Sequence, residues 1–469
     1  MVSSSEYNEP CETDEKCIKD YTPQYQCIQN HCQRKSFTFD NWREITGAIV
    51  VVIISMFANA GGLGAGAVII PVYVFIYGFY VTDSIPLSKI TIFAGAISNI
   101  MFIWNDRRPQ MKSRFLISYE MAATMIPLLL CGTMIGVYLS KLLPALVITV
   151  CLCLYLFYSV YKMFHKAMEL TRKENAALKI AADVAIKDQE TKEKQIIDSN
   201  NEPKATNMIT DDDYDRSGND TNVQTMIEEE NNVDRSLIKE EENTSTCFLM
   251  KEQGCNYAFL LGSYVMVIVI ALLRGGEGFK SVVGIPECSI GTWSLLAVSQ
   301  LIGFAMAVGS YKYNRAAYKA EDGTDVTKFQ QRRKIIYMSY ITGIAAGTLG
   351  IGGGMILGPF MLALGMDPQI STALSGFTVL FTSSSTSTQF TIAGAIHIEH
   401  AWVLMIFSLI GSLIGNLALK KLIAYYKRPS FVVWVIFGIL LLATFVLPGQ
   451  AIYDAITKPG ALNFNFNAC

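Results

Sequence analysis

The chain has 469 residues, of which 51% are hydrophobic and only 17% are charged. Soluble domains carry about 25% charged residues, and the apolar stretches here have the length of about 18–25 residues that spans a bilayer, so most soluble enzymes are excluded. The formal net charge of −2 offers no basic surplus for nucleic acid, and four scattered histidines exclude a His-rich metal site; we expect no cofactor.

Residues 1–40 form a polar segment that contains Cys11, Cys17, Cys27 and Cys32. A segment this small and polar cannot bury a core, so two disulfides are expected to hold it, facing an oxidising compartment. The competing interpretation is a zinc site that includes His31, although no C-x2-C pair is present. The chain starts without an apolar leader. Either the first membrane helix translocates the N-terminus, or a leader is missing from the sequence.

Apolar segments then follow one another along the chain. They are Thr46–Ala60, Leu63–Tyr80, Pro86–Trp104, Phe115–Ser140, Pro144–Phe164, Tyr257–Leu273, Thr292–Tyr311, Ile335–Leu349, Met355–Leu364, Thr372–Ile396, Trp402–Leu419 and Phe431–Leu447. Glycine runs interrupt the stretches 46–80 and 335–364. If both stretches are broken pairs, every strongly basic loop falls on the cytoplasmic side when the N-terminus lies outside. We therefore expect about twelve membrane segments, some of them re-entrant.

A polar insert, residues 165–254, separates the first five segments from the rest. Its first part is helix-forming, and its acidic second part cannot bury enough apolar surface to fold alone, so a cytosolic linker is expected. It carries two glycosylation sequons, at Asn219 and Asn243, which this topology predicts to stay unmodified. Residues 255–311 hold two linking membrane helices, and residues 448–469 form a tail.

The membrane part repeats itself. Gly62–Pro71 (GLGAGAVIIP) aligns without gaps with Gly350–Pro359 (GIGGGMILGP), and Ser88–Asn99 aligns with Thr372–Ser383. The basic loops fall at different places in the two copies, residues 46–164 and 335–447. Homologous segments with reversed charge bias predict inverted topology, as in secondary transporters. The expected fold is all-α: a polytopic membrane protein with two inverted repeats, each containing a helix pair broken by glycines.

The glycine runs are the candidate substrate site. A helix that restarts after such a run presents unpaired amides and a positive dipole end, and glycine lets a small anion approach them. The predicted substrate-binding residues are Gly62, Gly64, Gly66, Ser98, Asn99, Gly350, Gly352, Gly353, Gly354, Thr382, Ser383, Ser384 and Lys89. The competing interpretation is close packing of helices through small residues, which we assign to the later Gly132-x3-Gly136 and Gly411-x3-Gly415. Lys89 either neutralises an anion or extends to the outer face.

The paired motifs Gly62-x-Gly64-x-Gly66-x4-Pro71 and Gly350-x-Gly352-Gly353-Gly354-x4-Pro359 resemble those of the sulfite exporter TauE/SafE family. The likeness covers both repeats, and the Cys-bearing N-terminal segment is similar to the eukaryotic branch. The resemblance implies transport of sulfite or an organosulfonate. The first copy departs from the fuller glycine run, with Ala65 where the second has Gly353.

The sequence thus predicts a transporter of a small anion that works by alternating access in a plasma membrane or endomembrane, with the N-terminus outside or luminal. The alternative is a membrane receptor or scaffold that uses the Cys-rich segment and the cytosolic insert. No ligand cluster or nucleophile arrangement indicates an enzyme. The expected partners are a small inorganic or organic anion and the lipid bilayer, with no nucleic acid, and the oligomeric state stays open.

Overall fold

The structure is a computed structural model. It describes residues 25–28, 31–34, 41–60, 64–79, 81–108, 115–200, 254–276, 278–286, 289–315, 326–364 and 366–426, with a few single positions between 434 and 448. Contacts divide the chain into two units, Met1–Ala167 with Gln253–Cys469, and Met168–Glu252. The predicted segment Phe431–Leu447 lies largely outside the described residues.

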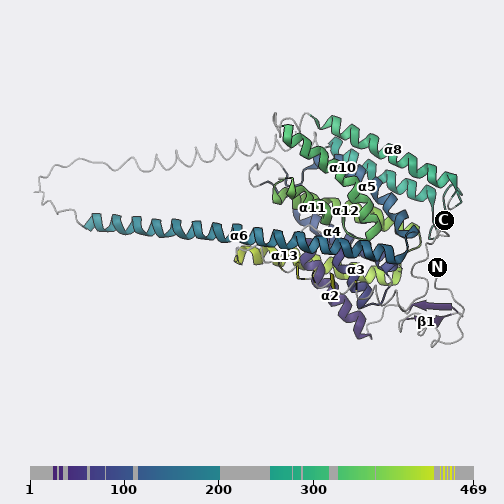
Figure 1. Ribbon diagram of the computed structural model, residues 1–469, viewed down its shortest axis with the longest axis horizontal. Coiled ribbons are helices and arrows are strands. Elements are labelled where there is room, and N and C mark those ends of the chain that lie inside the picture. The colour runs from purple at the N-terminus through teal and green to yellow at the C-terminus, as the bar shows by residue number, and fades with distance from the viewer. Residues whose placement is uncertain are drawn as a thin grey trace, which may run out of the picture. The chain divides into compact units, whose positions relative to one another are not determined.

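Helices make up nearly all of the described chain (Figure 1). They are α2 (Trp42–Ala60), α3 (Gly66–Phe75), α4 (Val81–Ile103), α5 (Tyr119–Leu142), α6 (Ala145–Asn200), the helix Gly254–Arg274, α8 (Ile290–Tyr313), α10 (Val326–Leu349), α11 (Gly353–Ala363), α12 (Pro368–Ile392) and α13 (Ile398–Tyr426). Each of the first eleven predicted apolar segments coincides with one of these helices. The stretches 46–80 and 335–364, which were expected to be broken by glycines, are both interrupted. The interruptions lie between Ala60 and Gly66 and between Leu349 and Gly353.

Seven of the described helices are long and apolar enough to cross a membrane: α2, α4, α5, the first part of α6, Gly254–Arg274, α8 and the first part of α13. This confirms an all-α polytopic membrane protein. α8 exposes large apolar side chains such as Ile290 and Leu301, which suits contact with lipid. The shorter α3 and α11, the charged start of α10 and the hydroxyl-rich α12 are not among the seven, so the full count of about twelve membrane segments stays a prediction.

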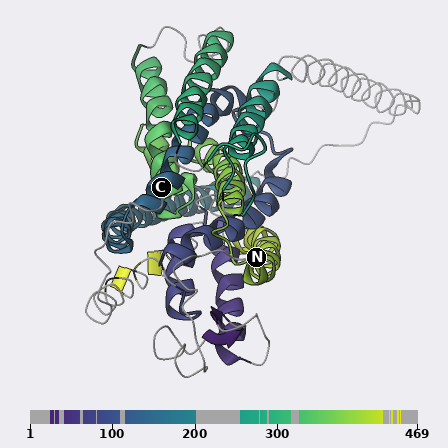
Figure 2. The same cartoon turned by 90° about the vertical axis from the view of Figure 1, so that its right-hand side faces the viewer.

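The packing exchanges helices between the two predicted repeats. α2 of the first packs against α13 of the second, and α10 of the second packs against α5 of the first. α4 and α12 contact each other, α4 also contacts α13, and α12 contacts α5. Figure 2 shows the yellow-green α13 beside the purple helices of the first repeat. The contact of α2 with α13 thus corresponds to that of α10 with α5, and the contact of α4 with α13 corresponds to that of α12 with α5.

Glycines set the distance within the two exchanged pairs. A Cβ added to Gly132 or Gly136 of α5 would collide with the α10 backbone, which itself presents Gly343 and Gly347 at this contact. A Cβ on Gly411 or Gly415 of α13 would collide with the Val52 and Met56 carbonyls of α2. These glycines therefore pack helices backbone to backbone, the role the sequence assigned to both GxxxG motifs.

A short hairpin precedes the helices and was not predicted. β1 (Tyr25–Ile28) pairs antiparallel with β2 (His31–Arg34), and Cys27 lies opposite Cys32 in the register. Cys27 is disulfide-bonded. Cys11 and Cys17 lie outside the described residues, so the pairing of the four cysteines stays a prediction. Among the residues that the structure describes, no group of three or more His, Cys, Asp or Glu side chains could hold a metal ion.

Candidate functional site: two glycine loops and a buried lysine

The first glycine loop, described from Gly64 to Gly66, lies against the second, Gly350–Gly352. Gly64 and Gly350 have φ angles of +75° and +74°, a conformation that favours glycine. A Cβ added to Gly66 would lie 2.7 Å from the Gly350 carbonyl oxygen and 3.0 Å from the Gly352 nitrogen. The two interruptions therefore touch through their backbones, although the repeats that carry them are far apart in the sequence. Gly62 lies outside the described residues.

Each loop leads directly into the start of a short helix. The Val68 and Ile69 amides donate to the Ala65 carbonyl at 3.0 and 2.9 Å, and the Met355 amide donates to the Gly352 carbonyl at 3.0 Å. Neither Ala65 nor Gly352 has a side chain that could accept a hydrogen bond from the first amides of α3 or α11. Two positive helix ends therefore lie at the contact of the loops without capping side chains, an arrangement that suits a small anion.

Lys89 of α4 is fully buried beside the second loop. Its Nζ donates to the Ile351 carbonyl at 2.8 Å, and the neighbouring Ser88 hydroxyl donates to the Gly350 carbonyl at 3.2 Å and to Ile85 at 2.7 Å. The idea that Lys89 extends to the outer face is therefore wrong, because its amine is held by the loop. No carboxylate among the described residues forms an ion pair with it. A buried ammonium without a counter-charge is costly, and an anion would supply that charge.

The predicted hydroxyl donors separate in the structure. Thr382 lies beside the second loop, with its methyl 3.2 Å from the place of a Cβ on Gly353, and its hydroxyl donates within α12 to Thr378 at 3.0 Å. Ser383 likewise donates within α12, to Val379 at 2.6 Å. Ser384 instead hydrogen-bonds to Tyr264 of the helix Gly254–Arg274. Successive residues of a helix point about 100° apart, so a run of hydroxyls cannot face one site.

Of the polar pair on α4, Ser98 faces α13. Ser98 lies 3.5 Å from the Asn416 amide nitrogen of α13, and Asn99 is buried. Ser88, Ile92 and Val379, which the sequence analysis did not select, do reach the loops. For Ser88 a signal existed, since it directly precedes Lys89. For Ile92 and Val379 there was none, because an apolar residue in a membrane helix has no distinguishing feature.

Comparisons with known proteins show the family of this chain. The family profile described as "Sulfite exporter TauE/SafE" matches residues 47–196 and 257–446. Similar proteins from Arabidopsis thaliana include Sulfite exporter TauE/SafE family protein 5, 23% identical over 88% of this chain and 84% of the relative, and family protein 3, 25% identical over 89% and 80%. No solved structure gave a significant match. The chain therefore belongs to the sulfite exporter TauE/SafE family of membrane transporters.

Proposed function

We propose that the protein carries a small sulfur-containing anion, such as sulfite or an organosulfonate, across the membrane, and that the anion binds where the two glycine loops meet. The observation that carries this proposal is the buried Lys89 amine at the second loop, which has no carboxylate partner in the described chain. The helix starts at Gly66 and Gly353 add two positive dipole ends. The names of the Arabidopsis relatives support sulfite as the first anion to test.

Alternating access is the mechanism we propose. The exchanged contacts, α2 with α13 and α10 with α5, support two repeats related by a pseudo-two-fold axis, and inverted repeats with sites on broken helices are typical of secondary transporters. A Cβ on Gly352 would lie only 3.6 Å from the Gly64 Cα, so the loops are close together. For an anion to fit between them, the two loops must move apart. Such a movement would open and close the binding site, as alternating access requires.

The direct test is flux through the full chain in proteoliposomes. We expect uptake of sulfite, thiosulfate or methanesulfonate above that of protein-free vesicles, and no uptake of choline, a cation. The double variant Gly64→Val with Gly352→Val should lose this flux while the protein still reaches the membrane. Absence of flux for all three anions in the wild type would refute the proposed function, and unchanged flux in the double variant would refute the site.

The N-terminus is proposed to lie outside or in a lumen, with the cysteines of residues 1–40 in disulfides. This orientation places the insert that contains Asn219 and Asn243 in the cytosol. Both sequons should therefore remain without glycan when the protein is expressed in a eukaryotic cell, as judged by its mobility before and after glycosidase treatment. A glycan on either asparagine would reverse the orientation. The family match begins at residue 47, after the Cys-rich segment, and so does not favour a receptor.

A further inference from the structure

Two histidine–carboxylate pairs lie at one end of the helix bundle. His400 Nε2 lies 3.9 Å from a Glu44 carboxylate oxygen, and His397 Nε2 lies 3.8 Å from Asp83 Oδ2. The chain has only four histidines, and half of them take part in these pairs. Phe79 lies between the pairs, with its ring centroid 5.6 Å from that of His397 and 5.3 Å from that of His400.

The pairs differ in burial. The side chains of Glu44 and His400 are 5% and 3% exposed, whereas those of Asp83 and His397 are 16% and 19% exposed. The more exposed pair, Asp83 with His397, is called the outer pair and can exchange protons with water. The more buried pair, Glu44 with His400, is called the inner pair and lies behind it. A histidine is charged only when it is protonated, so each pair is either a carboxylate beside a neutral ring or an ion pair.

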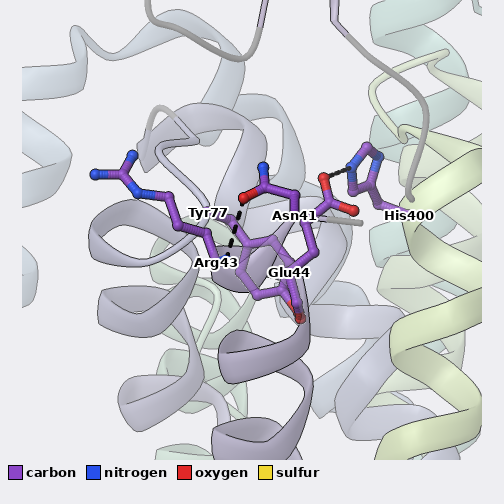
Figure 3. A network of polar contacts seen from close by, with 5 residues as sticks. All are labelled: Asn41, Arg43, Glu44, Tyr77 and His400. Carbon is purple, nitrogen blue, oxygen red and sulfur yellow. Dashed lines mark hydrogen bonds and ion pairs between the residues drawn. The ribbon is translucent and has the colours of Figure 1, made fainter. Parts of the chain in front are cut away.

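Two charged residues, Arg43 and Glu399, adjoin the inner pair in the sequence. Figure 3 shows the Glu44 carboxylate turned toward His400, while Arg43 of the same helix points away. The Tyr77 hydroxyl donates to the Glu44 backbone carbonyl at 3.2 Å, and Glu399 of α13 is exposed. His400 lies in the first turn of α13, whose positive end repels an imidazolium, while Glu44 attracts it.

Each pair joins the two predicted repeats. Both carboxylates belong to the first repeat, in the first turns of α2 and α4, and both histidines belong to the second, at the start of α13. Protonation of the histidines would hold α13 to α2 and α4, and loss of the protons would weaken this attachment. Lys89 follows Asp83 by six residues on α4, about 9 Å along one helix. A movement of α4 at the outer pair therefore reaches the lysine at the glycine loops.

We propose that Glu44 with His400, and Asp83 with His397, form a proton-binding site that couples anion transport to proton movement. This inference rests on the proposed function, because coupling requires that an anion moves. It adds a second ligand, the proton, at a place distinct from the glycine loops.

The test uses the full chain in proteoliposomes with methanesulfonate, the anion of a strong acid, which carries no proton itself at neutral pH. The membrane potential is clamped, and a gradient of about one pH unit is imposed, which can drive up to about tenfold accumulation for one coupled proton. We expect such accumulation in the wild type, with its direction set by the gradient. In His400→Gln and Glu44→Gln the accumulation should fall to about onefold, while downhill flux continues.

His165→Gln is the matched control, because His165 is an exposed histidine on α6 that contacts Tyr161 and not the pairs. It should keep the accumulation of the wild type. Accumulation in His400→Gln equal to that of the wild type would overturn the proton site and leave the proposed function intact. A wild type that carries none of the three anions would overturn the proposed function instead.

In that second case thermal unfolding of the purified protein still tests the pairs. The advantage in melting temperature of the wild type over His400→Gln should grow from about pH 8 to about pH 5, because a protonated His400 attracts Glu44. When Glu44→Gln takes the place of the wild type in this comparison, the difference in melting temperature should no longer grow as the pH falls. A pH dependence that is the same in the wild type and in His400→Gln would overturn the proton-binding pairs.

Discussion

The two glycine loops arise from the same repeated sequence, yet they have different surroundings. The second loop accepts hydrogen bonds from Ser88 and Lys89, at Gly350 and Ile351. Ser88 and Lys89 align with Thr372 and Ala373 in the second repeat, and an alanine offers no amine to the first loop. The first loop, at Gly64, faces the apolar Val379. The repeat thus fixes the backbone of both loops, whereas substitutions on the following helix place a cation at only one of them.

The largest effect is expected where the two loops touch. In Gly66→Ala the new methyl would lie 2.7 Å from the Gly350 oxygen, too close for the backbone to accept without movement. Overpacking of this kind costs about 1–3 kcal/mol or more, so we expect both a lower melting temperature and flux near background.

Gly352→Ala is the control for that variant. Its methyl would meet Val379 at 3.5 Å and Gly64 at 3.6 Å, which are ordinary contacts. It should retain most of its stability and flux, measured with the same vesicles and the same thermal scan. Equal losses in the two alanine variants would mean that the loops do not touch as described.

A smaller effect, confined to transport, is expected for Lys89→Met. Removal of a buried charge offsets the loss of the hydrogen bond to Ile351, so the melting temperature should change little. Flux should fall at least about tenfold, because the anion loses its counter-charge, a difference of about 1.4 kcal/mol.

Lys280→Met, at an exposed lysine, should behave as the wild type in the same flux assay. A Lys89→Met variant with full flux would assign Lys89 a purely structural role and would make the two loops equivalent.

The smallest effect is expected for Ser88→Ala. Its hydroxyl shares its donation between Gly350 and Ile85, and loss of one such bond costs about 0.5–1.5 kcal/mol. Chemical or thermal unfolding would detect this change. Thr372→Ala, at the aligned and partly buried position, should be closer to neutral. If Thr372→Ala were the more damaging of the two, the first loop would be the one that depends on side-chain support.

Local features of this protein could be predicted from its sequence, because they depend on nearby residues. Apolar length predicted the helices, and glycine at Gly64 and Gly350 predicted the interruptions, since few other residues adopt a positive φ. The directions of side chains could not be predicted in the same way. Ser384 faces Tyr264 and Ser98 faces Asn416 because of the rotation of α12 and α4 against their neighbours. That rotation depends on packing across the whole bundle.

The pairs at the bundle end show the same limit. Glu44 and His400 are separated by most of the chain, and only the exchange of helices between the repeats brings them together. A contact of this kind depends on which helices become neighbours. The β1–β2 hairpin was missed for another reason, since its strands are only four residues each and contain polar side chains.

The glycine contacts between α5 and α10, and between α2 and α13, join helices from the two halves of the sequence at their closest approach. Backbones that meet at glycine leave no room for a side chain between them, so a movement within either pair must break these contacts. Each pair contains one helix from either half of the sequence. In the alternating access that we propose, the moving parts would therefore combine helices of both halves, and the boundary between them would not coincide with the boundary between the repeats.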